Sequence, residues 1–418
     1  MTKCRREFVA LLASAAFIPI AGVAAPASAQ APSEWKVGAL FPFSGPLAFL
    51  GQETFRGAEI ASRIINESGG INGTKIVWEK ADAGSPAQAR SEAERLANAG
   101  IKVVVGTNAS GLAMAASQVL EQQKVIFWEP GSAVEELTTR GYKYTFRTVP
   151  PGSEWAHTLA DYAVDKVAPA LGKTKETVRI AVKYEDGAFG NSISKYLVDR
   201  LKSKGVTVVA SESYSARATD LSSLVLKLKE AKPDIILSTD YPNDAILFAR
   251  QSKELGLPTK AVLGWAGIAF PKFRQDLGDY AEGMMSINML MDLDPARLPP
   301  ETRQVREKFR EYYKKDTGSE PPAFTAVGFD SAWALFKYVL PKAGKNDADA
   351  IREAAMATDL PEGALTMGWG LKFSTPSGDS KHLGQNLRAV VGVTQWQDGK
   401  LVLVWPERFA SGSLRAPK

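Results

Sequence analysis

The sequence predicts an α/β protein with two lobes, each built on a doubly wound parallel sheet. Short strands rich in β-branched residues alternate with helices of roughly 10 to 16 residues, an order typical of parallel sheets that carry helices on both faces. The alternation runs through residues 34–147 and starts again after the stiff segment Phe146 to Pro151 (FRTVPP). A restart after such a segment indicates that the chain crosses from one lobe to the other.

Local signals place the elements of the first lobe. Strands are expected at 35–41, 75–81, 103–105 and 125–128, and helices at 52–68, at 86–99 and from Ser110 onward. Gly69 and Gly70 end the first helix, whereas Ser85 and Pro86 supply an N-cap and a proline at the first position of the second.

The second half of the chain repeats this pattern and then changes. Strands are expected at 178–184, 206–211, 234–238 and 260–263, and helices at 191–203, 220–229 and 243–255. Residues 284–291 are a further strand or a crossing, and amphipathic helices are expected at 301–315 and 323–340. A terminal hairpin at 388–396 and 401–405 turns at Asp398-Gly399.

The first 29 residues have the composition of a signal peptide. Basic residues precede the apolar run from Phe8 to Ala25, and Ala27-Ser28-Ala29 is a small-residue cleavage site. The pair Arg5-Arg6 resembles a twin-arginine signal, with an ordinary signal as the alternative. Cys4 lies upstream of the apolar run, where lipidation is not expected. We expect a periplasmic chain that is cleaved near Ala29.

Charge and composition exclude several classes of function. The formal charge is +5, of which the signal carries +2 (three basic residues less one acidic), so the remaining +3 does not indicate a nucleic-acid partner. No later segment approaches the roughly 18 apolar residues that a membrane span needs. The one cysteine lies in the signal, and His157 and His382 have no metal-site spacing, so we expect no metal and no cofactor. The tetrad Ser192 to Lys195 fits a serine hydrolase, but its companion motifs are missing, which argues against an enzyme.

The turn between the third strand and its helix is a candidate anion site. Val103 to Gly106 is followed by the polar turn from Thr107 to Ser110, which includes Asn108 and Ala109. Backbone N–H groups at a helix N-terminus favour a carboxylate by roughly 0.3–1 kcal/mol from the helix dipole, in addition to their hydrogen bonds. The alternative is that Ser110 is only a helix cap.

Four segments resemble the periplasmic leucine/isoleucine/valine-binding protein family. They are Val37 to Pro46 (VGALFPFSGP), Gly51 to Gly73, Leu137 to Pro150 (LTTRGYKYTFRTVP) and Thr219 to Leu228 (TDLSSLVLKL). The resemblance implies the type I periplasmic binding protein fold, in which two lobes are joined by a three-segment hinge and close on a ligand. It places the crossings near 147–151, 283–288 and 364–370. The lobes would then be 34–147 with 288–364, and 148–287 with 365–410.

The same resemblance implies a set of ligand residues. The family's carboxylate-binding serine falls on Ser110, with further contacts on Gly131, Ser132 and Ala133, where the family's threonine is missing. Aromatic walls fall on Phe189 and Tyr241 in the second lobe, and apolar walls fall on Leu50 and Phe324 in the first.

One departure concerns the ligand's amino group. The acidic residue that pairs with this ammonium in the family falls on Ala266, beside Trp265. Glu129 is our first candidate for a substitute, followed by Asp240 and Glu185, and each is otherwise a solvated or hinge-paired carboxylate. Because breaking a buried ion pair costs roughly 3–5 kcal/mol, either another acid replaces the missing one or the ligand has no ammonium.

We therefore expect a binding protein of an ABC importer that delivers its ligand to inner-membrane permease subunits. The ligand would be a branched-chain or related amino acid, or another small hydrophobic or aromatic carboxylate. Trp128, Trp265 and Phe43 would widen the pocket, unless they belong to the core. We expect a monomer without stable membrane insertion. The alternatives are a soluble sensor or receptor component, and a binder of an amide or urea-type ligand.

Overall fold

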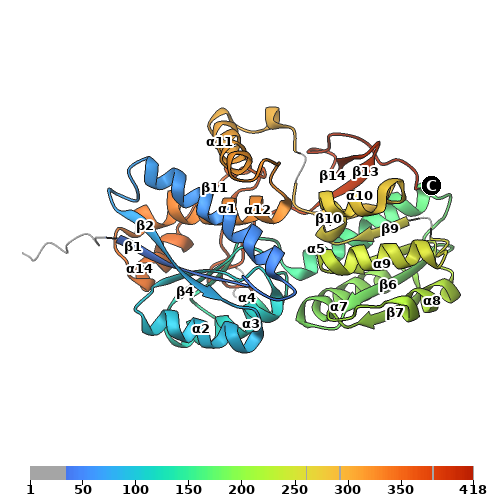
Figure 1. Ribbon diagram of the computed structural model, residues 1–418, viewed down its shortest axis with the longest axis horizontal. Helices are drawn as coiled ribbons and strands as arrows, with labels where there is room; N and C mark the ends of the chain where they lie inside the picture. The colour runs from blue at the N-terminus through green and yellow to red at the C-terminus, as the bar shows by residue number, and fades with distance from the viewer. Residues whose placement is uncertain (1–33, 260, 291–292, 379–380, 418) are drawn as a thin grey trace, which may run out of the picture. The chain divides into compact units, whose positions relative to one another are not determined.

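A computed structural model describes residues 34–259, 261–290, 293–378 and 381–417, which lie in one compact unit. The signal peptide predicted for residues 1–29 lies outside the described residues. Two larger sheets organise the chain (Figure 1), and the polar turns that the sequence singled out follow the carboxyl ends of their strands. No helix in the described part of the chain is long and apolar enough to span a membrane.

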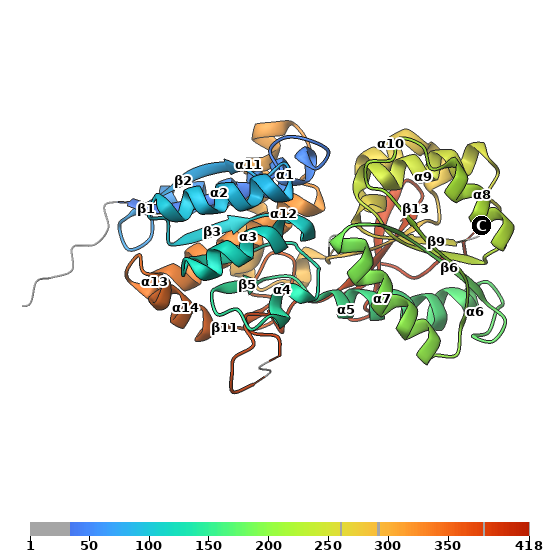
Figure 2. The same ribbon diagram turned by 90° about the horizontal axis from the view of Figure 1, so that it is seen from below.

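The first sheet is entirely parallel, with strand order β2-β1-β3-β4-β5. Its strands are β1 (Glu34–Phe41), β2 (Lys75–Asp82), β3 (Val103–Gly106), β4 (Ile126–Glu129) and β5 (Thr145–Arg147). The helices α1 (Ala48–Glu67), α2 (Pro86–Asn98), α3 (Ser110–Gln122) and α4 (Glu136–Thr139) connect them. Helices α2 and α3 lie beside each other on one face of the sheet, below it in Figure 1 and toward the viewer in Figure 2. Ser85 caps α2 as predicted, since its side chain accepts a hydrogen bond from the Gln88 N–H at 3.3 Å.

Later parts of the chain return to this first sheet. They form α11 (Pro300–Thr317), α12 (Ala323–Ala334), a π-helix at Leu335–Val339, α13 (Leu340–Ala343) and α14 (Ala348–Met356). A Cβ on Gly57 of α1 would lie 1.9 Å from the Thr325 carbonyl oxygen of α12, so only glycine permits this close approach (Figure 1). All residues of α12 are buried, and the prediction of an amphipathic helix is therefore wrong for this element.

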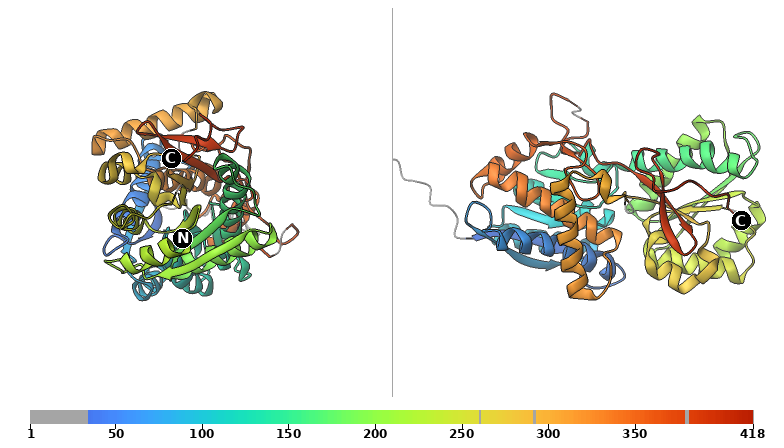
Figure 3. Two further views of the ribbon diagram at one scale, coloured as in Figure 1. Left: turned by 90° about the vertical axis from the view of Figure 1, so that its right-hand side faces the viewer. Right: turned by 90° about the horizontal axis from the view of Figure 1, so that it is seen from above.

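The second sheet is mixed, with strand order β14-β13-β10-β9-β8-β6-β7. The parallel strands are β6 (Arg179–Glu185), β7 (Thr207–Tyr214), β8 (Ile235–Thr239), β9 (Ala261–Gly264) and β10 (Met285–Asn288). The predicted terminal hairpin is present as β13 (Gly392–Gln397) and β14 (Lys400–Trp405), drawn in red in Figure 3, and it adds to β10 in antiparallel orientation.

Helices α5 (Gly152–Tyr162), α7 (Ala188–Ser203), α8 (Ser222–Ala231), α9 (Pro242–Glu254) and α10 (Pro271–Leu277) accompany this sheet. The chain between α5 and β6 continues as a π-helix at Ala163–Val167 and α6 (Ala168–Ala170). Short 3-10 helices lie at Ala266–Ala269, Gly278–Ala281 and Pro295–Arg297. Together these elements define the second lobe.

Two of the predicted crossings contain strands. Residues 145–147 form β5 of the first sheet, so the predicted first crossing begins at the last residue of that strand, and residues 285–288 form β10 of the second, in line with the strand alternative given for 284–291. The chain therefore leaves the first sheet after Arg147 and the second sheet after Asn288.

The segment between α14 and β13 contacts the first lobe. Its small sheet pairs β11 (Asp359–Leu360) with β12 (Leu371–Lys372). Thr366 donates two hydrogen bonds to Asp330 of α12, and the ring of Phe373 lies 5.2 Å from Trp128. The predicted boundary at residue 364 assigns this segment to the other lobe; we propose a third crossing at residues 389–391 instead.

Candidate functional site

Ser110 begins a helix at the carboxyl edge of the first sheet. The chain leaves β3 at Gly106, and Ala109 is the N-cap of α3 with extended backbone angles. Ser110 is thus the first helical residue and not the cap. Its Oγ accepts a hydrogen bond from the Val134 N–H at 3.2 Å and from the Ser132 hydroxyl at 3.3 Å. The hydroxyl is buried at the edge where a parallel sheet places its ligand.

Glu129 organises the two turns beside Ser110. Its side chain is fully buried at the end of β4, and its oxygens accept four backbone hydrogen bonds. The donors are the N–H groups of Thr107 (2.6 Å), Asn108 (3.0 Å), Gly131 (2.8 Å) and Ser132 (2.8 Å). Burial raises the pKa of Glu129 to about 7, while these N–H groups act in the opposite direction. Both carboxylate oxygens are already used, which argues against Glu129 as the partner of a ligand ammonium.

Arg147 stabilises the second of these turns, which follows β4, through hydrogen bonds to its backbone. This guanidinium is fully buried and donates to the Val134 carbonyl oxygen at 2.5 Å, to Thr138 Oγ1 at 3.0 Å and to Gln385 Oε1 at 2.6 Å. Burial lowers the pKa of Arg147 to about 10, although Glu135 and other carboxylates raise it. Arg147 is thus a structural residue that fixes the backbone donors from residue 132 to 134.

Close packing between the two turns leaves no room for a side chain at residue 131. A Cβ added to Gly131 would lie 1.5 Å from Asn108 Oδ1. Asn108 itself has a positive φ of 64° and donates a hydrogen bond to Thr54 Oγ1 at 2.5 Å. Glycine at this position therefore fixes the distance between the turns.

Ten of the predicted ligand residues line one small cavity between the two lobes. They are Leu50, Asn108, Ser110, Gly131, Ala133 and Phe324 of the first lobe, and Phe189, Asp240, Tyr241 and Trp265 of the second. The cavity has a volume of about 30 Å³, which is room for a group the size of one water molecule.

The remaining predicted residues are placed differently. Ala109 lines an adjoining cavity. Ser132 and Glu129 do not line the small cavity: the Ser132 N–H donates to Glu129, and the Ser132 hydroxyl donates to Ser110. Ala266 is in the short 3-10 helix after β9, and its side chain lies outside the described residues. Trp128 is core and donates from its indole N–H to the Ser331 carbonyl oxygen, while Phe43 packs on Phe55.

Aromatic rings form most of the second-lobe wall. Trp265 lies between Trp155 and Phe189, with ring centroids 4.7 and 4.9 Å away, and Phe189 is 5.3 Å from Tyr241. Sequence reasoning missed Trp155, Pro242 and Met289, which also line the cavity. Trp155 lies on α5, directly after the first crossing, where its sequence context resembles that of any core tryptophan.

A larger cavity of about 710 Å³ adjoins the small one and shares Leu50, Tyr241 and Pro242 with it. First-lobe residues from three turns line it, including Phe49, Pro86, Ala109 and Gly111; second-lobe residues include Glu185, Arg217 and Asp244. Volumes of roughly 300–1,000 Å³ are typical of small-molecule sites. Of the two cavities, only the outer one has the volume of a small-molecule site, and the inner one is a narrow extension of it toward Ser110.

The second lobe contributes buried carboxyl groups to this region. Glu185 accepts the N–H groups of Gly187 and Gly190, each at 2.6 Å, and so fixes the start of α7. Asp240 follows β8, and its Oδ2 accepts a hydrogen bond from Lys183 Nζ at 2.6 Å; both side chains are buried. Of the three acids predicted as substitutes for residue 266, Asp240 is the one that lines the inner cavity.

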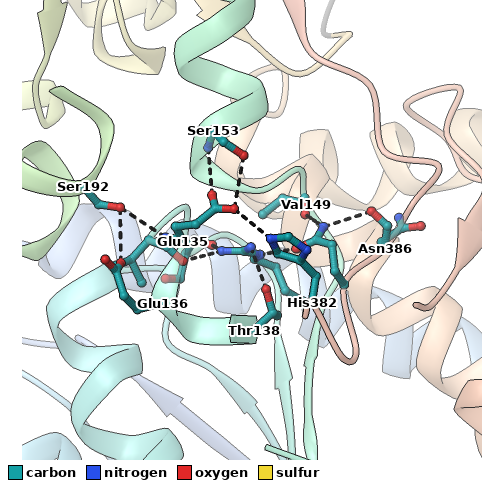
Figure 4. Close-up of polar contacts among 12 residues, drawn as sticks. Glu135, Glu136, Thr138, Val149, Ser153, Ser192, His382 and Asn386 are labelled. Carbon is teal, nitrogen blue, oxygen red and sulfur yellow. Dashed lines mark hydrogen bonds and ion pairs between the residues drawn. The ribbon is translucent and has the colours of Figure 1, made fainter. Parts of the chain in front are cut away.

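A polar network joins the lobes next to the first crossing (Figure 4). The Glu135 carboxylate accepts the Ser153 N–H at 2.8 Å and the Ser153 hydroxyl at 3.1 Å, and it lies 3.2 Å from His382 Nε2. Ser192 of α7 accepts the Glu135 N–H at 3.2 Å and donates to Glu136 at 3.3 Å. Ser192, which was considered as part of a hydrolase tetrad, thus forms contacts between the lobes. The described residues contain no cluster of His, Cys, Asp and Glu that could hold a metal ion.

Comparisons with known proteins agree with this architecture. Residues 34–399 match the family described as periplasmic binding protein. The chain is 38% identical over 398 residues to the Leu/Ile/Val-binding protein homolog 7 of Brucella suis biovar 1 (strain 1330), covering 94% of this chain and 96% of that one.

Two solved structures share the fold at lower identity. The branched-chain amino acid transporter substrate-binding protein LivJ from Streptococcus pneumoniae, in complex with isoleucine, has a TM-score of 0.74 and 22% identity over 88% of this chain and 97% of its own. An ABC transporter solute-binding protein from R. palustris in complex with benzoate has a TM-score of 0.73 and 19% identity over 92% and 97%. The predicted two-lobed fold is confirmed, and the chain belongs to the periplasmic binding protein family, whose members are binding proteins and not enzymes.

Proposed function

We propose that this chain is the extracytoplasmic solute-binding protein of an ABC importer and that it binds a small carboxylate between its lobes. The observation that carries the proposal is the arrangement at Ser110. A buried hydroxyl and the first turn of α3 lie at a cavity whose other lobe is aromatic. Helix N-termini favour anions, and rings favour an apolar body. A carboxylate with a hydrophobic or aromatic body therefore matches the chemistry of both walls: the helix N-terminus of the first lobe and the aromatic rings of the second.

The relatives support this choice of ligand class. A relative at 38% identity is named Leu/Ile/Val-binding protein homolog 7, and proteins of the same fold hold isoleucine in one structure and benzoate in another. Within the proposal, the Ser110 hydroxyl and the backbone N–H group of Ala133 receive the carboxylate beside Gly131, whose own N–H donates to Glu129. Phe189, Tyr241, Trp265, Leu50 and Phe324 enclose the remainder, with Asn108, Ala109 and Ser132 supporting the turn.

The proposal includes the route and the partners of the protein. The signal peptide directs the chain to the periplasm with cleavage near Ala29, and the loaded protein delivers its ligand to inner-membrane permease subunits as a monomer. The hydrogen bonds around Glu135, which join the two lobes, would form when the lobes close. Co-purification with permease subunits supports this route, whereas co-purification with a sensor kinase supports the receptor alternative.

A thermal-shift screen of the mature chain tests the ligand class. Leucine, isoleucine, valine and phenylalanine are compared with their des-amino analogues, with benzoate, and with an amide, a sugar and urea as controls. A ligand at 100 times its Kd stabilises the folded state by about 2.7 kcal/mol, so a true ligand raises the melting temperature clearly. The proposal would be refuted if the amide, the sugar or urea raised the melting temperature and no carboxylate did.

A further inference from the structure

Asp240 occupies a distinctive position in the interlobe site. It follows the last residue of β8 and lines the same small cavity as Ser110, from the opposite lobe. Its side chain is 2% exposed. Within the described residues, Oδ1 has no hydrogen-bond partner, although Oδ2 is paired with Lys183. A buried charged oxygen without a donor is unfavourable, which makes Oδ1 a point where a ligand group gains a hydrogen bond.

The neighbouring charges favour a cationic donor. Lys183 is held over the ring of Phe248 at 4.2 Å and is paired with Asp240, while Asp244 and Glu185 lie nearby in the same lobe. Burial and then Asp240 raise the pKa of Asp244 to about 7, and Lys183 acts in the opposite direction. Lys183 thus interacts with both Asp240 and Asp244, and Glu185 is a third carboxyl group near Asp244, so a second positive charge in the cavity is electrostatically favourable.

We infer that Asp240 is a specificity-determining residue of this site: Oδ1 accepts a hydrogen bond from a protonated amino group of a ligand whose carboxylate lies at Ser110. The inference rests on the proposed function and narrows its ligand class to amino acids. Asp240 thereby takes the role that the family resemblance assigned to residue 266, which is alanine in this chain. Asp240 lies in the turn after β8, and residue 266 lies in the turn after β9, the neighbouring strand in the sheet.

A competing role for Asp240 is purely structural. Asp240 also lines a separate cavity of about 430 Å³ inside the second lobe, where Ser238, Phe248 and Phe273 are among its neighbours. If Oδ1 serves that cavity, the residue stabilises the lobe without discriminating between ligands. The two roles differ in one measurable respect, which is the preference of the protein for an amino group.

A ligand series tests the inference on the wild-type mature chain by isothermal titration calorimetry. L-Leucine carries the ammonium, 2-hydroxy-4-methylpentanoate carries a neutral donor at the same atom, and 4-methylpentanoate carries neither. L-Phenylalanine, 3-phenyl-2-hydroxypropanoate and 3-phenylpropanoate repeat the series with a ring. The inference predicts that affinity falls in this order, with the amino acid about 10- to 100-fold tighter than the des-amino acid.

The variant Asp240→Asn should remove most of this preference and leave the affinity for the des-amino acid within about threefold. Asp330→Asn is the matched control, because Asp330 is a buried acid of the first lobe whose carboxylate is bonded to Thr366 and Met367. That variant should keep the wild-type preference.

Three outcomes would overturn the inference. A wild-type protein that binds the des-amino acid as tightly as the amino acid contradicts it, and this comparison needs no variant to fold. A preference for amino acids that survives Asp240→Asn assigns Asp240 the structural role. If no member of either series binds, and no other carboxylate does, the proposed function itself fails and the inference fails with it.

Discussion

The four hydrogen bonds to Glu129 lead to a specific prediction for the variant Glu129→Leu. Leucine is similar in size but has no acceptor, so four backbone N–H groups between residues 107 and 132 lose their partner. Each buried donor left unpaired costs about 1–3 kcal/mol, and relaxation of the turns recovers part of the total. We expect a loss of at least about 3 kcal/mol in the free energy of unfolding, a large part of the roughly 5–15 kcal/mol of a typical domain.

Urea unfolding followed by tryptophan fluorescence measures this loss as a lower midpoint at unchanged slope. Glu136→Leu is the matched control, since Glu136 is exposed and its carboxylate accepts a single hydrogen bond in the described part of the chain, from the Ser192 hydroxyl at 3.3 Å. The control should change stability by less than about 0.5 kcal/mol. If Glu129→Leu unfolds within about 0.5 kcal/mol of the control, Glu129 does not hold the turns and the account of the site is wrong.

Two further predictions concern the pH dependence of stability and the packing of the turns. Burial raises the pKa of Asp244 from 3.8 to about 7, so the folded state keeps a proton that the unfolded state releases; the stabilisation is present at low pH and is lost as the pH rises through 7. Relative to wild type, Asp244→Asn should therefore be more stable at pH 8 than at pH 5 by up to about 3 kcal/mol, and a pH-independent difference in denaturant titrations would contradict this. Gly131→Ala should lower the free energy of unfolding by about 1–3 kcal/mol because its Cβ meets Asn108, whereas Gly111→Ala, with open space around its Cβ, should be tolerated. Equal melting temperatures for the two alanine variants would show that the turns are not closely packed.

The sequence predicted the first-lobe half of the site because strand, turn and helix follow one another locally. Val103 to Ser110 places a hydroxyl at a helix start, and the parallel sheet then brings residues 131–133 beside it. The order of the elements and the rule that ligands lie at the carboxyl ends of strands are enough to single out the turn at Ser110, whereas residues 131–133 were placed by the family resemblance.

The parts that the sequence did not predict depend on contacts between distant segments. Trp155 lines the cavity because the first crossing directs α5 past the site, and no local pattern shows where a crossing leads. Glu129 was taken as a ligand residue because its position at the end of β4 is visible in the sequence, whereas the four N–H groups that surround it come from two separate turns. We propose a third crossing later than the one expected from the sequence; the described residues between 361 and 391 contain little regular structure, so periodicity gives no boundary there.

The central claim, that Ser110 receives a ligand carboxylate between the lobes, is tested most directly by the affinity of Ser110→Ala. Ser117→Ala is the matched control: Ser117 is a buried serine on the same helix whose hydroxyl donates to the Ala113 carbonyl oxygen. Titration calorimetry with the tightest carboxylate of the panel should show a loss of about 1–3 kcal/mol for Ser110→Ala, which is about 5- to 150-fold in Kd. The control should bind as the wild type does. Equal affinity of both variants would contradict the claim.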